Sequence, residues 1–379
     1  MDTDTIPVSG VDELDKHLDE LIADPTLPPI VKLFDDVELQ LTGKYNSNTL
    51  YTSGGWHTDF PALEDANILP LIPRLLPKIT EILQQYQQDP AILCSLAIKL
   101  LGPLNFTQIL SLASENAIIQ AMRSPAPSAN ILAMTVLEKA AKSPSEAAIL
   151  AAMKNVVTHF LTQWLSAPQV EVGEKGSKVL GDLLDVDCDT RPPDGVAVSG
   201  VEIAVRRPAG QGFMWRRVFH DRDVYCLLLS LCSTGSHQAA EGGQTDQQVS
   251  LAQGRLLRIL PRLAALNFAA LTRTDFPELN QRYANFEGNG GLLHFAALHM
   301  IDEEDPLMHL TLVDFFEALL SIQRVTPFST YKMDTLKKLI RDATTRDSAL
   351  KTAITSLPER TIPEEADDLR QFIREVMAP

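Results

Sequence analysis

The stretch VEVGEKGSKVLGDLL, residues 170–184, decides between two kinds of protein. Its glycines and lysines suggest the phosphate-binding loop of a nucleotide enzyme. That loop needs four residues between its first glycine and a Gly-Lys-Ser/Thr triplet. Counted from Gly173, the triplet would begin at residue 178, which is a lysine. The order Gly176-Ser177-Lys178 also puts the lysine after the serine. The signature is absent, and we expect no nucleotide cofactor.

The same residues fit an amphipathic helix. One face of that helix is apolar and includes Gly176, where the missing side chain lets a neighbouring helix approach closely. The apolar face comprises Val172, Gly176, Val179, Leu180, Leu183 and Leu184, and the polar face comprises Glu174, Lys175, Lys178 and Asp182. The stretch therefore predicts a packed helix of a helical protein.

Helical spacing of apolar residues recurs along the chain. It covers residues 71–83, 92–101 and 149–165, whereas strand-like alternation is confined to residues 195–207. Four expected helix starts place a capping side chain before a proline, at Asp24, Asp89, Ser143 and Asp305. These patterns predict an all-α fold.

Prolines at 125, 144 and 168 bracket two successive helices in a unit of about 43 residues, the length of HEAT and armadillo repeats. One helical hairpin cannot bury its own apolar face, so such units stack into a curved α-solenoid. Irregular insertions interrupt this expected array at residues 46–65, 185–200 and 233–248. We expect an N-terminal half over residues 1–189, a loop or β-like insertion over 190–212, and a C-terminal half over 213–379.

The chain is acidic, with 33 Lys and Arg against 49 Asp and Glu among 379 residues, a net charge of −16. Nucleic-acid affinity rests largely on basic side chains, so direct nucleic-acid binding is not expected and a basic protein partner fits better. Neither a membrane span nor a leader peptide is apparent. The four cysteines, Cys94, Cys188, Cys226 and Cys232, lack zinc spacing. We expect a monomeric protein of the cytosol or nucleus, with its thiols reduced and buried.

Other candidate sites are weaker. Gly210-Gln211-Gly212 and the glycine-rich run at 288–291 lack a dinucleotide fingerprint, and a turn before a helix explains each better. His294 and His299 are five residues apart, which would place them on different sides of a helix, and His309 adds no recognised ligand spacing. We therefore expect no metal site and no enzyme.

The segment FMWRRVFHDRDVY, residues 213–225, mixes aromatic residues with arginines, a composition typical of partner-binding hot spots. Alternatively, its aromatics fill the core while nearby acids neutralise its arginines. A second cluster is acidic and precedes a strong helix, where part of its charge serves the helix dipole. The candidate partner-interface residues are Phe213, Trp215, Arg216, Arg217, Arg222, Asp302, Glu303, Glu304 and Asp314.

Three segments resemble a known family: residues 172–187, 213–232 and 293–320. They are similar to the fungal proteins labelled for mismatch repair as HSM three, and to their animal counterpart, proteasome non-ATPase regulatory subunit five. The resemblance covers most of the chain from about residue 66, and residues 46–65 depart from it. It implies a HEAT-like solenoid that chaperones assembly of the proteasome regulatory particle. Such a protein binds the C-terminal domain of an AAA-ATPase subunit of the base and masks its docking on the core particle.

Two other functions remain open. The fungal label suggests a factor associated with DNA mismatch repair, although the net charge of −16 disfavours direct contact with DNA. Helical repeats are also compatible with a scaffolding protein of the karyopherin type.

Overall fold

The computed structural model describes residues 8–41, 67–189, 209–234 and 244–378. Regular structure in these ranges is helical, and its β structure is limited to one antiparallel bridge between Arg273 and Gly290. The all-α prediction is confirmed. The strand-like run at 195–207, the insertion at 46–65 and residues 190–208 of the predicted insertion lie outside the described ranges. Among the described helices, none has the length and apolar character needed to cross a membrane.

The chain divides into two compact units, residues 1–139 and 140–379. The boundary falls in the last turn of α8 (Pro127–Ala140). The division that the sequence suggested near residue 190 lies inside the second unit.

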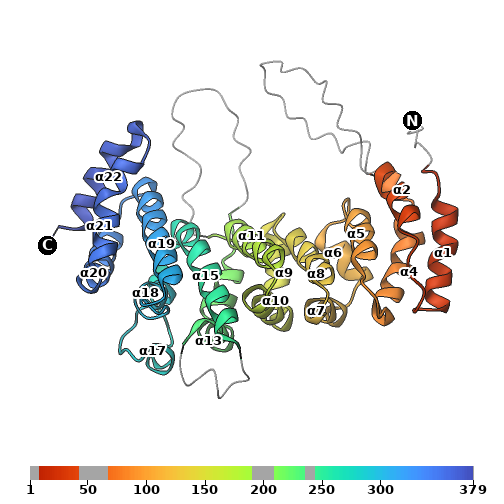
Figure 1. Ribbon diagram of the computed structural model, residues 1–379, viewed down its shortest axis with the longest axis horizontal. Helices are drawn as coiled ribbons and strands as arrows, with labels where there is room; N and C mark the ends of the chain where they lie inside the picture. The colour runs from red at the N-terminus through yellow and green to blue at the C-terminus, as the bar shows by residue number, and fades with distance from the viewer. Residues whose placement is uncertain (1–7, 42–66, 190–208, 235–243, 379) are drawn as a thin grey trace. The chain divides into compact units, whose positions relative to one another are not determined.

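Unit 1 is built from helix pairs (Figure 1). Helix α1 packs on α4 while α2 packs on α5, so that one pair covers the next. Ion pairs tie α4 to α1: Arg74 contacts Asp15 at 2.9 Å, and Lys78 contacts the same carboxylate at 2.7 Å. Burial favours protonation of Asp15, but Lys78 and Arg74 outweigh it and lower the pKa of this carboxyl. The described helices before α8 are α1 (Val11–Ala23), α2 (Val31–Leu41), α4 (Ile72–Gln85), α5 (Ala91–Leu100), α6 (Phe106–Leu112) and α7 (Glu115–Arg123).

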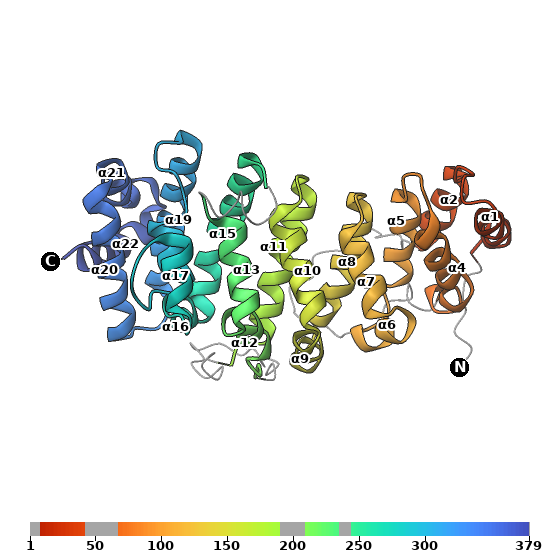
Figure 2. The ribbon, with the colours of Figure 1, turned by 90° about the horizontal axis from the view of Figure 1, so that it is seen from below.

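Unit 2 is organised around its longest helix, α15, which packs against α10, α11, α13 and α19 (Figure 2). Its buried apolar face supplies the centre of the core. Its described helices are α9 (Pro144–Ala152), α10 (Lys154–Ser166), α11 (Val170–Val186), α12 (Phe213–Phe219), α13 (Arg222–Cys232), α15 (Asp246–Leu266), α16 (Phe268–Thr272), α17 (Pro277–Ala284), α18 (Leu292–Leu298), α19 (Pro306–Val325), α20 (Thr330–Arg346), α21 (Ser348–Ser356) and α22 (Pro363–Val376), with a 3₁₀ turn, η1 (Leu357–Arg360), before the last.

Residues 170–184, the stretch without the phosphate-loop signature, fold as part of α11, and the predicted apolar face is buried. Gly176 lies against the indole of Trp164, so close that an added Cβ would fall 2.5 Å from a ring carbon. Gly173 makes similar room for the guanidinium of Arg255, and Gly181 for that of Arg262. The glycines thus admit large side chains from α10 and α15, and the prediction of close helix packing is confirmed.

Several helix boundaries follow the predicted capping pattern. Asp305 accepts backbone N–H bonds from Leu307 and Met308 at the start of α19, and Ser143 accepts one from Glu146 at the start of α9. The prediction at Asp24 is wrong, because this residue ends α1 and its carboxylate binds the backbone of Thr26 in a turn. The helical spacing over 149–165 is divided between two helices at Met153, whose φ of −84° and ψ of 67° are not helical and end α9 before α10 begins.

The cysteines are free thiols. Cys94, Cys188 and Cys232 are buried as expected, whereas Cys226 is half-buried, with its Sγ 3.3 Å from the Tyr283 hydroxyl. Burial raises the pKa of the Cys94 thiol to about 11, so this group stays protonated near neutral pH.

Candidate partner-binding surface

The predicted aromatic–arginine segment folds into α12 and α13. A buried carboxylate, that of Asp187 after α11, fixes the start of α12 by accepting N–H bonds from Gln211 at 3.0 Å and Met214 at 2.5 Å. Burial raises the pKa of Asp187, although these backbone donors oppose the shift. Gly212 precedes the helix with φ 68°, a left-handed conformation that favours glycine. The predicted turn before a helix is confirmed at this position.

Trp215 belongs to the core. Its side chain is 3% exposed, its Nε1 donates to the carbonyl of Leu184 at 2.9 Å, and its ring packs 5.3 Å from that of Phe219. The hydrogen bond to Leu184 fastens α12 to the C-terminal end of α11. For this residue the structure supports the core role that the sequence left open.

Phe213 has the opposite environment. It is 46% exposed, and the guanidinium carbon of Arg216 lies 4.6 Å from the centre of its ring, a cation–π arrangement. Arg216 donates to the carbonyl of Gln211 at 2.8 Å. The exposed Asp189 lies nearby beside Gly212, but in the described part of the chain no carboxylate reaches ion-pair distance of Arg216. Its remaining N–H groups can therefore bind a partner.

These two residues edge a shallow groove of about 750 Å³ between α9 and α12, here called the α9–α12 groove. Its apolar part includes Ile149, which is 39% exposed. Ile149 belongs to the apolar spacing that the sequence shows over 149–165, but adjacent apolar residues in one helix give no signal for which of them faces solvent. The groove is lined by Ala148, Ile149, Ala151, Ala152, Phe213, Arg216, Arg217, His220 and Asp221.

Arg217 holds the groove together rather than facing a partner. Its Nε donates to the carbonyl of Ala151 at 2.7 Å, and its Nη1 is bonded to Asp221. Asp221 also contacts Lys154 at 3.1 Å. Burial would raise the pKa of Asp221, but Lys154, a backbone amide and Arg217 lower it on balance. This arginine is thus neutralised by an acid, as the core alternative expected.

The remaining predicted residues lie elsewhere in unit 2. Arg222 pairs with Glu278 at 3.1 Å, and both side chains are exposed. Asp302, Glu303 and Glu304 are exposed in the turn before α19, and Asp314 is exposed on α19. The structure therefore brings Phe213, Arg216 and Arg217 together and places the acidic residues on another element.

The histidines differ from expectation. His294 and His299 do not point to different sides, because α18 ends at Leu298 and His299 leaves helical geometry with φ −138°. Both rings face Phe286, with centroids 6.5 Å and 4.6 Å from its ring centre. Burial lowers the pKa of both imidazoles. Among the described residues, no three or more His, Cys, Asp or Glu side chains are grouped so that they could hold a metal ion.

No protein-family model matches the chain, and no curated protein is detectably similar to it.

Proposed function

We propose that this protein is a non-enzymatic assembly chaperone of the proteasome regulatory particle base. It would bind the C-terminal domain of an AAA-ATPase subunit and block the docking of that subunit on the core particle. The protein would be monomeric when free, act in the cytosol or nucleus, and need no cofactor. In this proposal the helix pairs continue as a HEAT-like solenoid, and binding is by surface contact alone.

The observation that supports a binding role best is the exposed Phe213–Arg216 pair at the α9–α12 groove. Phe213 combines a large apolar ring with little burial, and Arg216 retains unused donors. Aromatic and arginine side chains are the residues most enriched among binding hot spots. Both belong to residues 213–232, one of the three segments that resemble the chaperone family.

The architecture is compatible with the proposal. The resembling segments form α11, α12 with α13, and α18 with most of α19, all of which are packed helices of unit 2. A protein that masks a surface needs a stable, exposed helical face rather than a reactive side chain.

The test is affinity capture from a native lysate with the purified full chain as bait. We expect a proteasomal AAA-ATPase among the captured proteins, and much less of it with the Phe213→Ala and Arg216→Ala variants. Phe328→Ala is the matched control, since Phe328 is an exposed aromatic of unit 2 outside the groove, and it should capture as wild type does. Failure of the wild-type chain to capture any proteasomal ATPase would refute the proposal.

The same preparation separates the alternatives. Retardation of duplex DNA at near-physiological salt would support the repair function instead. Capture of transport cargo without proteasomal subunits would support the karyopherin-like scaffold.

A further inference from the structure

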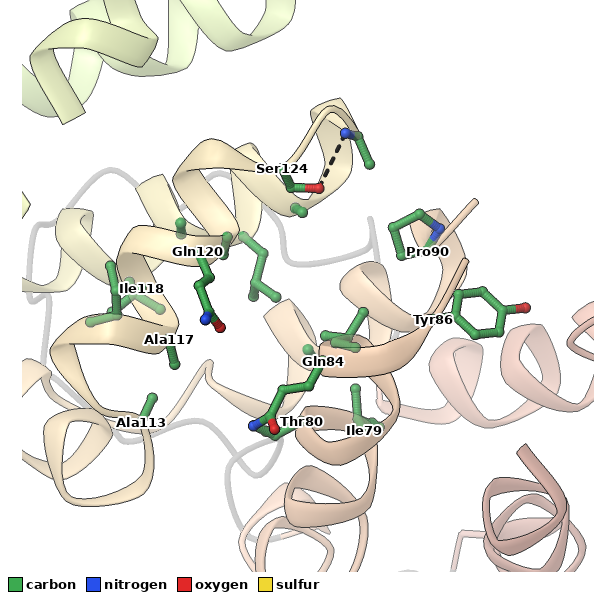
Figure 3. A pocket seen from close by; sticks show the side chains of 18 of the residues that line it. Ile79, Thr80, Gln84, Tyr86, Pro90, Ala113, Ala117, Ile118, Gln120 and Ser124 are labelled. Carbon is green, nitrogen blue, oxygen red and sulfur yellow. Dashed lines mark hydrogen bonds between the residues drawn. The ribbon is translucent and has the colours of Figure 1, made fainter. Parts of the chain in front are cut away.

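Two grooves of the protein differ in charge. A groove of about 480 Å³ between α4, α7 and α8 in unit 1 is lined by uncharged side chains, among them Gln84 and Gln120 (Figure 3). The lining of the α9–α12 groove in unit 2 combines apolar residues with two arginines, a histidine and an aspartate. A charge in a groove selects a partner of opposite charge, so the α9–α12 groove discriminates among partners in a way that the groove of unit 1 does not.

Arg216 is the cation of the α9–α12 groove that has no ion pair within the described ranges. The other charged groups of the lining have partners. Arg217 is paired with Asp221, and the ring of His220 lies 2.6 Å from the carboxylate of Asp275. The positive charge of Arg216 is therefore the one that a partner can neutralise.

The guanidinium of Arg216 is held in position at the groove. Its Nη2 donates to the carbonyl of Gln211 at 2.8 Å, and its central carbon lies 4.6 Å from the ring centre of Phe213. Asp189, beside Gly212, is near the guanidinium but outside ion-pair distance, so it weakens the positive charge without neutralising it. A guanidinium that is already oriented loses little conformational freedom when its other N–H groups bind a ligand.

Apolar surface lies beside this charge. Phe213 and Ile149 both line the groove and are 46% and 39% exposed, and Ala152 is exposed between α9 and α10. Covering such side chains removes apolar surface from water and favours binding. A well-matched occupant therefore carries a negative group and a bulky apolar group side by side.

The negative group fits a carboxylate better than a phosphate. A planar guanidinium can donate two parallel N–H bonds to one carboxylate. Sites for phosphorylated peptides use clusters of arginines, and the second arginine of this groove, Arg217, is already bound to Asp221. The net charge of −16 repels a run of acidic residues, so a single carboxylate is favoured over an acidic stretch.

We propose that the α9–α12 groove binds a peptide segment of the partner in which one Asp or Glu lies beside a bulky aliphatic or aromatic residue. The carboxylate pairs with Arg216, and the apolar side chain packs on Phe213 and Ile149. This assignment rests on the binding role proposed above for the groove, and it adds the chemistry of the segment that binds there.

The test is selection of peptides from a random display library on the immobilised full chain. We expect the enriched peptides to combine one acidic residue with a neighbouring Leu, Ile, Met or Phe. The Arg216→Glu variant should enrich Lys or Arg in place of the acidic residue, because the charge of the groove is reversed. Arg341→Glu is the matched control, since Arg341 is an exposed arginine of α20 outside the groove, and it should enrich the same peptides as wild type does.

Titration of an enriched, fluorescently labelled peptide measures the pairing by anisotropy. Replacing its acidic residue by the neutral amide should weaken binding about tenfold, and Arg216→Gln should weaken binding of the original peptide about equally. A peptide with lysine in place of the acid should bind Arg216→Glu more tightly than it binds wild type. Asp189→Asn removes a nearby negative charge and should tighten binding of the acidic peptide about threefold. Circular dichroism checks that each variant is folded.

Enriched peptides without an acidic residue, the same enrichment by Arg216→Glu and wild type, or no enrichment at all would overturn the assignment. Weaker binding of the acidic peptide to Asp189→Asn would also contradict it. If acidic peptides bind at Arg216 but no proteasomal ATPase is captured from the lysate, the chaperone function fails and the assignment stands. If the ATPase is captured equally by wild type and Arg216→Glu, the assignment fails and the chaperone function stands.

Discussion

The guanidinium of Arg255 donates to the carbonyl of Trp164 at 2.7 Å and binds the C-terminal end of α10 from within the core of unit 2. Further donors reach the carbonyls of Leu165 at 3.2 Å and Gln169 at 3.0 Å. Burial lowers the pKa of this arginine, and Arg258 adds to the effect. The last carbonyls of a helix lack partners within it and carry partial negative charge, so they stabilise a buried cation.

Other buried polar side chains have the same role. The Asn130 amide donates to the carbonyls of Ala121, Met122 and Ser124 at the end of α7. The Lys332 ammonium binds carbonyls after α19, among them that of Pro327 at 2.8 Å. Each such side chain comes from a helix later in the chain, so packed helices are joined by hydrogen bonds as well as by apolar contacts.

Removing the Arg255 cap should destabilise unit 2. Arg255→Met keeps much of the apolar stem but leaves buried carbonyls unpaired, which costs about 2 kcal/mol of unfolding free energy. Urea denaturation measures the change. Arg258→Met is the matched control on the same helix, where the side chain is exposed, and it should change stability by less than about 0.5 kcal/mol. Equal effects of the two substitutions would contradict the capping role.

Replacing either of two helical glycines by alanine should change the free energy of unfolding, in opposite directions at the two positions. Gly176→Ala places a methyl group 2.5 Å from the buried Trp164 ring and should cost about 1–3 kcal/mol through overpacking. Gly254→Ala, in the interior of α15, meets no atom within 4 Å and should stabilise the protein by roughly 0.5–1 kcal/mol. Thermal unfolding of both variants tests the pair, and stabilisation by Gly176→Ala would exclude the close approach.

The neighbours Phe213 and Trp215 should separate binding from stability. Trp215→Ala removes a buried ring and should lower the free energy of unfolding by about 3–5 kcal/mol. Phe213→Ala should change stability by less than about 0.5 kcal/mol and weaken partner binding by more than about 1 kcal/mol. Calorimetry gives the first quantity and titration with the captured partner gives the second. A partner affinity unaffected by Phe213→Ala would remove this residue from the interface.

Stability should fall as the solution becomes mildly acidic. Burial is the main cause that lowers the pKa of the His294 and His299 imidazoles. The positive charge of Lys338 lowers the pKa of His294 further, and Asp342 opposes this shift. Arg346 lowers the pKa of His299 in the same way. Their folded pKa values thus lie below the unfolded value of about 6.5. At a pH between the folded and the unfolded pKa values, the unfolded chain binds more protons than the folded chain does. The stabilisation present above about pH 6.5 is therefore lost as the pH decreases.

Urea unfolding at about pH 7.5 and about pH 5.5 measures this loss. A double variant with His294→Gln and His299→Gln should lose less stability over the same interval, because it lacks both titrating rings. An identical loss in wild type and variant would assign the pH dependence to other groups.

Some local features were readable from the sequence because they depend on neighbours along the chain. Helical periodicity predicted α11 and its buried face, and Asp305 before a proline predicted the start of α19. The same capping rule failed at Asp24, where the chain forms a turn that the dipeptide equally permits. The expectation that His299 lies on a helix with His294 is wrong, because α18 ends at Leu298, one residue earlier.

Periodicity and capping by themselves determined that this protein is helical and where many of its helices begin, since both act over a few residues. Only the tertiary structure decided that Trp215 is core while Phe213 is exposed, that Arg255 and not Arg258 is buried, and that alanines of α7 and α8 form one uncharged groove with α4. Each of these outcomes depends on which helices pack together, and residues far apart in the chain carry no local signal of that contact.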